Sequence, residues 1–231
     1  MNRSMRQTAI IFSLALVFGS AAVEANGQNI LGEILKRMDM YNKSLQSLQA
    51  NLTMVKHNPQ LNVSDTSIGS TSFLPKAGKR PMYVRIDWTK PVEEQISVIG
   101  EKYELYRPRL KQMIRGTVDK AKNNPSAGGA LSFMSMGRDQ LKANYEVQLV
   151  GEESIRDGTA TWRLLLTPKV PTSYKTAELW VDKDGTPRQV KITERNNDTT
   201  TVLLEHLRKN QTLNVEIFKL KIPKDAKVVP V

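Results

Sequence analysis

The pattern of apolar and polar positions divides the chain into one helix followed by many short strands. Apolar residues recur every three or four positions over Gln28 to Ser44, with charged residues between them. This spacing predicts an amphipathic helix. From Leu45 the period is ambiguous, but from Leu48 to about His57 apolar and polar residues alternate, which predicts a strand.

A loop containing Pro59 is expected over Asn58 to Asp65, and short alternating segments follow it. Glycines and prolines separate these segments at close intervals, which is typical of an antiparallel meander, because parallel strands need a helix between them. The predicted strands are Ser67–Leu74, Met82–Trp88, Glu94–Ile99, Lys102–Tyr106 and Lys111–Arg115.

Residues 116–143 interrupt the strand pattern and end in a predicted short helix over Arg138 to Asn144. Alternation then resumes, and Asp157-Gly158 and Asp184-Gly185 are hairpin signals. In Leu213 to Ile222 the apolar phase slips between Ile217 and Phe218, so a bulge or break is expected there.

The pattern as a whole predicts an α+β chain, mostly antiparallel, with about 11 strands and helical pieces. A flat sheet of that size would leave a long exposed edge, so the strands are expected to curl. A curved antiparallel sheet with helices on its concave side fits best.

The first 25 residues have the layout of a cleavable secretory signal. Arg3 and Arg6 precede the uncharged run from Ala9 to Ala22, and Val23-Glu24-Ala25 places small residues at a cleavage position. The run is shorter than the roughly 20 residues that a membrane span needs. We therefore expect 1–25 to be a signal peptide and 26–231 to be one exported domain; an uncleaved anchor is the alternative.

The chain contains no cysteine. It therefore has no disulfide, no thiol nucleophile and no thiolate metal site, and no cysteine on which a bacterial lipoprotein would carry its lipid. Together with the signal, this predicts an exported periplasmic protein without a lipid anchor.

The formal net charge is +11, and basic residues are concentrated from Arg107 to Lys122. No nucleic-acid-binding motif accompanies them. Anionic lipid headgroups, an acidic patch on a partner protein, or simply a solvated strand face remain as interpretations.

Signals for an enzyme are weak. The two histidines, His57 and His206, have no second metal ligand near them in sequence, and there is no Gly-x-Ser-x-Gly elbow or phosphate-binding loop. We expect no catalytic residues, no metal and no cofactor.

Two stretches carry a more specific pattern. Lys79–Pro91 places Arg-Pro before a strand that ends in an aromatic and a later proline, and Gln95–Pro108 has two strands around a glycine. Glu178–Gly185 and Asn210–Pro223 add an Asp-x-x-Gly turn and an Asn…Phe…Pro series. In order and spacing they resemble the LolA family of periplasmic outer-membrane lipoprotein carriers, over about residues 28–228.

The resemblance implies an incomplete β-barrel whose helices close one mouth over an apolar cavity for lipoprotein acyl chains. It places Arg80 at the arginine that holds the empty form closed by hydrogen bonds to the lid; a plain turn role before Pro81 is the alternative. Valine at 84 is smaller than the bulky residue often found there. The apolar residues of 131–136 would form the lid or, equally, ordinary core. The expected lid and cavity lining comprises Val84, Ile86, Trp88, Leu131, Phe133, Met134, Met136, Trp162 and Trp180.

The function implied by the resemblance is a carrier that takes lipoproteins from an inner-membrane transporter toward an outer-membrane acceptor, acting as a monomer. Two alternatives are a related sensor that regulates an envelope stress response and a carrier for another envelope lipid. The absence of cysteine separates this chain from the lipid-anchored acceptor of the same fold.

Overall fold

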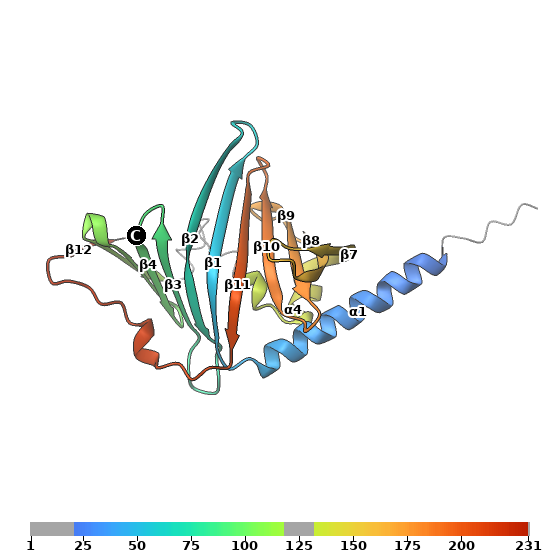
Figure 1. The fold of residues 1–231 in the computed structure, drawn as a ribbon, viewed down its shortest axis with the longest axis horizontal. Helices are drawn as coiled ribbons and strands as arrows, with labels where there is room; N and C mark the ends of the chain where they lie inside the picture. The colour runs from blue at the N-terminus through green and yellow to red at the C-terminus, as the bar shows by residue number, and fades with distance from the viewer. Residues whose placement is uncertain (1–20, 118–131, 231) are drawn as a thin grey trace, which may run out of the picture.

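The computed structural model describes residues 21–117 and 132–230, in which twelve strands form one open sheet (Figure 1). Its order is β12-β6-β5-β4-β3-β2-β1-β11-β10-β9-β8-β7. The helices and 3-10 turns are α1 (Ala21–Ser44), η1 (Pro108–Leu110), α4 (Arg138–Asn144) and η2 (Val215–Phe218). The strands are β1 (Leu48–Asn58), β2 (Val63–Leu74), β3 (Tyr83–Lys90), β4 (Glu94–Ile99), β5 (Lys102–Arg107), β6 (Gln112–Thr117), β7 (Tyr145–Ser154), β8 (Ala160–Pro168), β9 (Tyr174–Asp182), β10 (Pro187–Glu194), β11 (Thr199–Lys209) and β12 (Lys227–Pro230).

The sheet consists of two antiparallel meanders joined at its centre. β1 pairs with β2 along its whole length and with β11 on its other side, so the last long strand lies beside the first. The predicted antiparallel meander is present, but the sheet is open and has one strand more than expected. The added strand, β12, runs parallel to β6, and no periodicity in its four residues predicted this pairing.

One expected loop is shorter than predicted, and the break expected near Ile217 is present as a short 3-10 helix. The loop expected over 58–65 is a tight turn, because Asn58 Oδ1 accepts a hydrogen bond of 2.8 Å from Leu61 N–H and Asn62 adopts a left-handed φ of 51°. Residues 213–222 form no strand. Asn214 Oδ1 accepts from Glu216 N–H at 2.9 Å and starts η2, whose short helix contains the phase slip seen in the sequence.

The main core lies on one face of the sheet, which we call the inner face. Its apolar side chains come from strands β1 to β11 and pack against Ile34, Leu35 and Met38 of α1 and Leu141 of α4. The helical spacing of the α1 residues matches the amphipathic pattern of the sequence. The helix begins earlier than predicted, at Ala21, and ends at Ser44 as expected.

Close backbone contact fixes α1 beneath the sheet. Gly185, in the β9–β10 turn, has a φ of +81°, and a Cβ there would lie 2.3 Å from the carbonyl carbon of Arg37. Arg37 also donates a hydrogen bond of 3.0 Å to the carbonyl oxygen of Lys183. The Asp-Gly hairpin signal therefore marks both a turn and a helix contact that only glycine allows.

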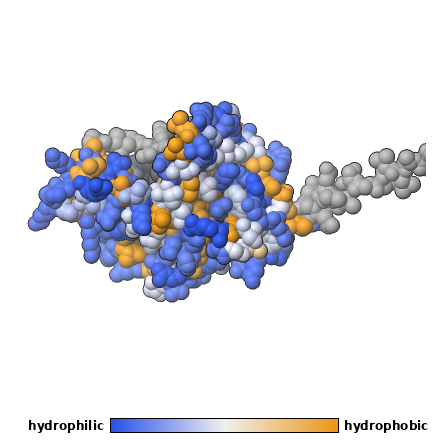
Figure 2. All heavy atoms as spheres, turned by 45° about the horizontal axis from the view of Figure 1, so that its top comes forward, coloured by the Kyte–Doolittle hydropathy of each residue, from blue (hydrophilic) through white to orange (hydrophobic). Residues whose placement is uncertain are grey.

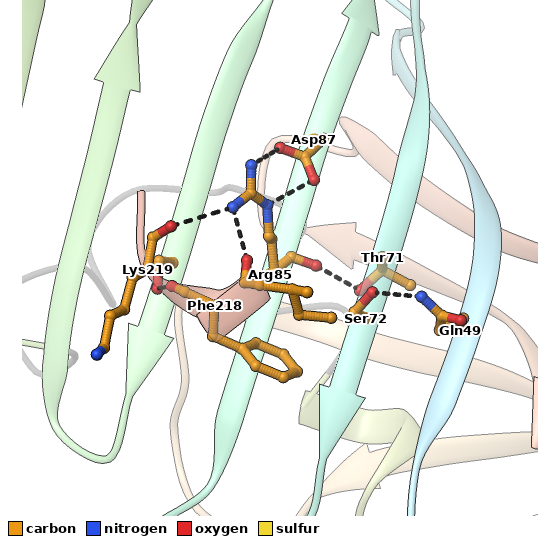
Figure 3. Close-up of polar contacts among 9 residues, drawn as sticks. Gln49, Thr71, Ser72, Arg85, Asp87, Phe218 and Lys219 are labelled. Carbon is orange, nitrogen blue, oxygen red and sulfur yellow. Dashed lines mark hydrogen bonds and ion pairs between the residues drawn. The ribbon is translucent and has the colours of Figure 1, made fainter. Parts of the chain in front are cut away.

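The opposite, outer face of β3 and β4 is covered by the C-terminal segment, residues 212–226. Phe218 is fully buried there, with its ring centroid 5.3 Å from that of Tyr83. Ser97 Oγ donates a hydrogen bond of 2.5 Å to the Phe218 carbonyl oxygen. Phe218 and its neighbour Lys219 are drawn in Figure 3. This segment leads the chain from β11 to the far edge, where β12 begins.

None of the helices in the described part of the chain has the length and apolarity of a membrane span.

Candidate functional site

A pocket of about 370 Å³ opens on the inner face of β1 to β5, near the end of the sheet that carries the β1–β2 turn (top in Figure 1). α1 runs from the lower end of β1 toward β7, beneath the half of the sheet that lies away from the pocket. The pocket is lined by Met54, Lys56, Asp65, Ser67, Trp88, Pro91, Val92, Glu94, Ile96, Tyr103, Leu105 and Arg107.

The floor of the pocket is apolar. Met54, Trp88, Ile96, Tyr103 and Leu105 are all buried members of the main core. Ile96 lies directly opposite Leu105, so the two side chains point to the same face of the sheet. These side chains can contact an apolar group of a ligand, although most of the lining that faces solvent is polar.

Polar groups gather at the edge of this floor. Arg107 Nε donates a hydrogen bond of 2.8 Å to Glu94 Oε1, and both side chains are about one-third exposed. Lys56 lies directly opposite Asp65 on β2. The edge can therefore meet a polar group of either charge, while an apolar tail lies on the floor.

Tyr103 keeps its hydroxyl neutral at the floor. Burial, and to a lesser extent the charge of Glu94, raise the pKa of the Tyr103 phenol above its ordinary value, against the opposing effect of Arg107. The phenol therefore stays un-ionised near neutral pH. In the described part of the chain, no cluster of three or more His, Asp or Glu side chains could hold a metal ion.

Three predicted lining residues on β3 share the inner face. Ile86 and Trp88 are buried in the main core, and Val84 packs against it. Of the three, Trp88 lines the pocket. Val84 and Ile86 lie lower on the strand.

The predicted lid segment packs against the other half of the sheet. Phe133 and Met134 are buried in the main core, and the Phe133 ring lies 5.7 Å and 5.8 Å from the rings of Tyr145 and Tyr174. Met136 packs partly against this core, and its carbonyl oxygen accepts a hydrogen bond of 3.0 Å from Asn42 of α1. Leu131 lies outside the described residues. A closed lid and ordinary core would both pack in this way, so the lid role stays a prediction.

The other two tryptophans predicted to line the cavity lie on opposite faces. Trp162 packs against the inner core with Arg37 5.4 Å above its ring, away from the pocket. Trp180 packs on the outer face with Ile155 and Leu203, so its predicted place in the cavity is wrong. Its neighbours on β9 occupy the inner face, and alternation turns Trp180 outward.

Arg80 lies in the β2–β3 turn, half-buried. Its Nη2 donates a hydrogen bond of 3.1 Å to the Pro75 carbonyl oxygen, and its buried Nε has no partner among the described residues. The predicted gate contact involves a lid that begins outside the described residues, so the gate role stays a prediction.

Sequence reasoning missed most of the pocket. The sequence predicts strands that contain Met54, Ile96, Tyr103 and Leu105, and it places Arg107 in a basic stretch, but no pattern brings these residues together. Alternation placed the apolar ones on a common face of each strand. Only the pairing of β1 to β5 joins them in one floor.

Residues 43–221 match the family described as outer membrane lipoprotein carrier protein LolA. The chain belongs to the LolA family. The match begins in the last turn of α1, spans the pocket strands and ends within the C-terminal segment. No curated protein matches the sequence significantly.

Solved structures share the LolA-family fold at low identity. An uncharacterized conserved protein from Thermus thermophilus is 14% identical with a TM-score of 0.55, over 87% of this chain and 99% of the other. The Pseudomonas aeruginosa MucA/MucB structure is 14% identical with a TM-score of 0.52, over 86% of this chain and 63% of the other. The Mycobacterium tuberculosis lipoprotein LppX is 15% identical with a TM-score of 0.50, over 80% of this chain and 98% of the other. At these identities the likeness concerns the fold alone.

Proposed function

We propose that this protein is a periplasmic carrier that binds lipoprotein acyl chains and moves lipoproteins from the inner to the outer membrane. The observation that carries the proposal is the apolar-floored pocket on the inner face of a LolA-family sheet. The secretory signal expected over residues 1–25 accounts for the compartment. An inner-membrane transporter would load the carrier, and an outer-membrane acceptor would unload it.

The size of the pocket sets what it holds. A methylene group takes up about the volume of a water molecule, roughly 30 Å³, so 370 Å³ accommodates about a dozen carbons. Each methylene that becomes fully buried gains about 0.8 kcal/mol, so the part of an acyl tail that the floor covers is stabilised relative to water.

A lipoprotein with three acyl chains needs more room than this pocket offers. The inner-face core around Phe133 and Met134 belongs to the same apolar cluster as the pocket floor, and displacing that segment would extend the apolar space toward β7 and β9. Methionine and phenylalanine side chains can line such an opened space as readily as they pack in the closed one. Opening by a partner then requires no covalent chemistry.

Filling the pocket tests the proposal. Ser67 lies on β2 opposite Met54 and lines the pocket, so Ser67→Phe places a ring in the apolar space without burying a charge. Ser70 is exposed on the same strand at the opposite parity, so Ser70→Phe is a matched control. We expect Ser67→Phe to weaken binding of a fluorescent fatty-acyl probe about tenfold or more, and Ser70→Phe to leave it unchanged. If Ser67→Phe and Ser70→Phe bind the probe equally well, the pocket is not the acyl-binding site.

Cargo identity is tested separately, by mass spectrometry of material that copurifies from the periplasm. Triacylated peptide supports lipoprotein transport, whereas free glycolipid supports a carrier of another envelope lipid. MucB, which has a similar fold, is solved in complex with MucA, and this motivates a second candidate, a sensor that acts through a protein partner. That candidate predicts a stable complex with a protein partner and no transfer of lipoprotein between membranes.

A further inference from the structure

The three turns above the pocket each carry an exposed aliphatic side chain. Leu61 in the β1–β2 turn is 73% exposed, Val92 in the β3–β4 turn 42%, and Leu110 in the β5–β6 turn 59%. We call these three turns, residues 59–62, 91–93 and 108–111, the mouth turns. Turn positions usually carry polar residues, and none of these three side chains is needed to fill the core.

The opposite end of the sheet differs. Its turns, at residues 75–82, 100–101, 155–159 and 183–186, contain none of the exposed large apolar side chains found in the described residues. Single exposed aliphatics are ordinary on a protein surface, but their presence on each of three neighbouring turns at one end is not a scattered arrangement. Figure 2, with the upper end turned forward, shows apolar spots among a mostly hydrophilic surface.

Basic residues flank two of the three aliphatic tips. Lys90 comes two positions before Val92, which the exposed Glu93 follows, and Arg109 comes directly before Leu110; both basic side chains are exposed. No carboxylate of the described residues forms an ion pair with either of them. Arg107 and Lys111 lie nearby, although they pair with Glu94 and Asp225. An aliphatic tip with cations beside it matches the chemistry of an anionic membrane surface, where apolar groups enter the interface and cations meet phosphates.

We propose that the mouth turns form a docking surface for an anionic phospholipid bilayer. Leu61 and Leu110 enter the interfacial region, and Lys90 and Arg109 contact lipid phosphates. The β1–β2 hairpin, which projects beyond the other turns in Figure 1, makes the first contact. Because Val92 also lines the pocket, docking brings the pocket mouth to the bilayer.

Membrane docking would serve the proposed carrier function, and its biological role rests on that function. An acyl chain could pass between bilayer and pocket over an apolar path, without exposing its full length to water. Membrane docking itself depends only on the turns, so it is measurable whether or not the pocket binds cargo.

The test is cosedimentation of the purified protein with vesicles of phosphatidylglycerol and phosphatidylethanolamine, compared with phosphatidylcholine vesicles. We expect Leu61→Ser/Leu110→Ser to lower the partition coefficient on the anionic vesicles about tenfold. Lys90→Gln/Arg109→Gln should bring binding to anionic vesicles down to the level on phosphatidylcholine. Val150→Ser, at a side chain of β7 that is 54% exposed, is the matched control and should change nothing.

Each outcome decides. The proposal is overturned if the wild type does not bind anionic vesicles, or if the wild type and the leucine double variant bind equally. Either result points to a protein partner at the mouth turns. Equal wild-type binding to both vesicle types overturns the role of Lys90 and Arg109. Binding of a fatty-acyl probe without vesicles is measured in parallel. Failure of the wild type to bind the probe would refute the carrier function and leave the docking result standing.

Discussion

The guanidinium of Arg85 on β3 donates a hydrogen bond of 2.6 Å to the carbonyl oxygen of Ile217, 132 residues later in the chain (Figure 3). The same guanidinium binds both oxygens of Asp87, at 2.7 and 2.8 Å. Asp87 thus fixes the direction of Arg85, and Arg85 holds the C-terminal segment on the outer face of the sheet.

Replacing Arg85 by alanine should therefore destabilise the protein. The substitution leaves the Ile217 carbonyl oxygen and the Asp87 carboxylate without their donor, which we expect to cost about 1–3 kcal/mol. The free energy of unfolding in urea measures this. Arg138→Ala is the control, because its contact with Asp139 is 4.0 Å long and exposed, and its effect should stay below about 0.5 kcal/mol. Equal effects would show that Arg85 is an ordinary surface residue.

The same segment is anchored by an aromatic side chain. Phe218 is fully buried against Tyr83, so Phe218→Ala should lower the free energy of unfolding by about 3–5 kcal/mol. Ile217→Ala, next to it but 36% exposed, should cost less than about 1 kcal/mol. A small effect at Phe218 would mean that the C-terminal segment is not part of the cooperative fold.

Phe133 distinguishes a lid from core. Because it is buried among Tyr145 and Tyr174, we expect Phe133→Asp to destabilise the protein by several kcal/mol, with probe binding failing as the protein unfolds. Denaturant midpoint and acyl-probe affinity are measured on the same samples. A near-normal midpoint with lost binding would instead assign the segment to a lid that swings into water.

The gate predicted at Arg80 has its own test. Its buried Nε lacks a described partner, so the guanidinium is only partly satisfied by Pro75 in this form. If Arg80 holds the empty state closed, Arg80→Leu should retain cargo and transfer labelled lipoprotein to the acceptor more slowly, roughly tenfold for a loss of about 1.4 kcal/mol. Lys79→Leu, at the exposed neighbouring position, should transfer normally. Unchanged transfer by Arg80→Leu would reduce Arg80 to a turn residue.

Alkaline pH should destabilise the protein through Tyr41. Burial, and then the charge of Asp182, hold the pKa of the Tyr41 phenol well above its ordinary range, despite Arg188. The folded state therefore keeps a proton that the unfolded chain releases near pH 10, so this stability is complete below pH 10 and falls as pH rises beyond it, by about 1.4 kcal/mol per pH unit. Unfolding midpoints measured from pH 8 to 11 should fall less steeply in Tyr41→Phe. A residual slope is expected from Tyr103 and Tyr174, whose phenol pKa values burial also raises.

The local sequence pattern determined those helices, strands and turns that are specified by their own residues. The three-and-four spacing predicted the helix up to Ser44, and period-two alternation predicted the long strands. Asp157-Gly158 and Asp184-Gly185 predicted hairpins, and both glycines have a positive φ. These features depend on neighbours within about ten residues, so sequence alone determines them.

Tertiary structure decided which face of a strand turns inward and which distant segments meet. On β9 apolar residues run without alternation from Leu179 to Val181, so only the pairing with β8 and β10 puts Trp180 outside. The parallel pairing of β12, the path of the C-terminal segment and the pocket floor all join residues far apart in the chain. Their free energy lies in contacts between residues far apart in the chain, and a local pattern of residues does not specify such contacts.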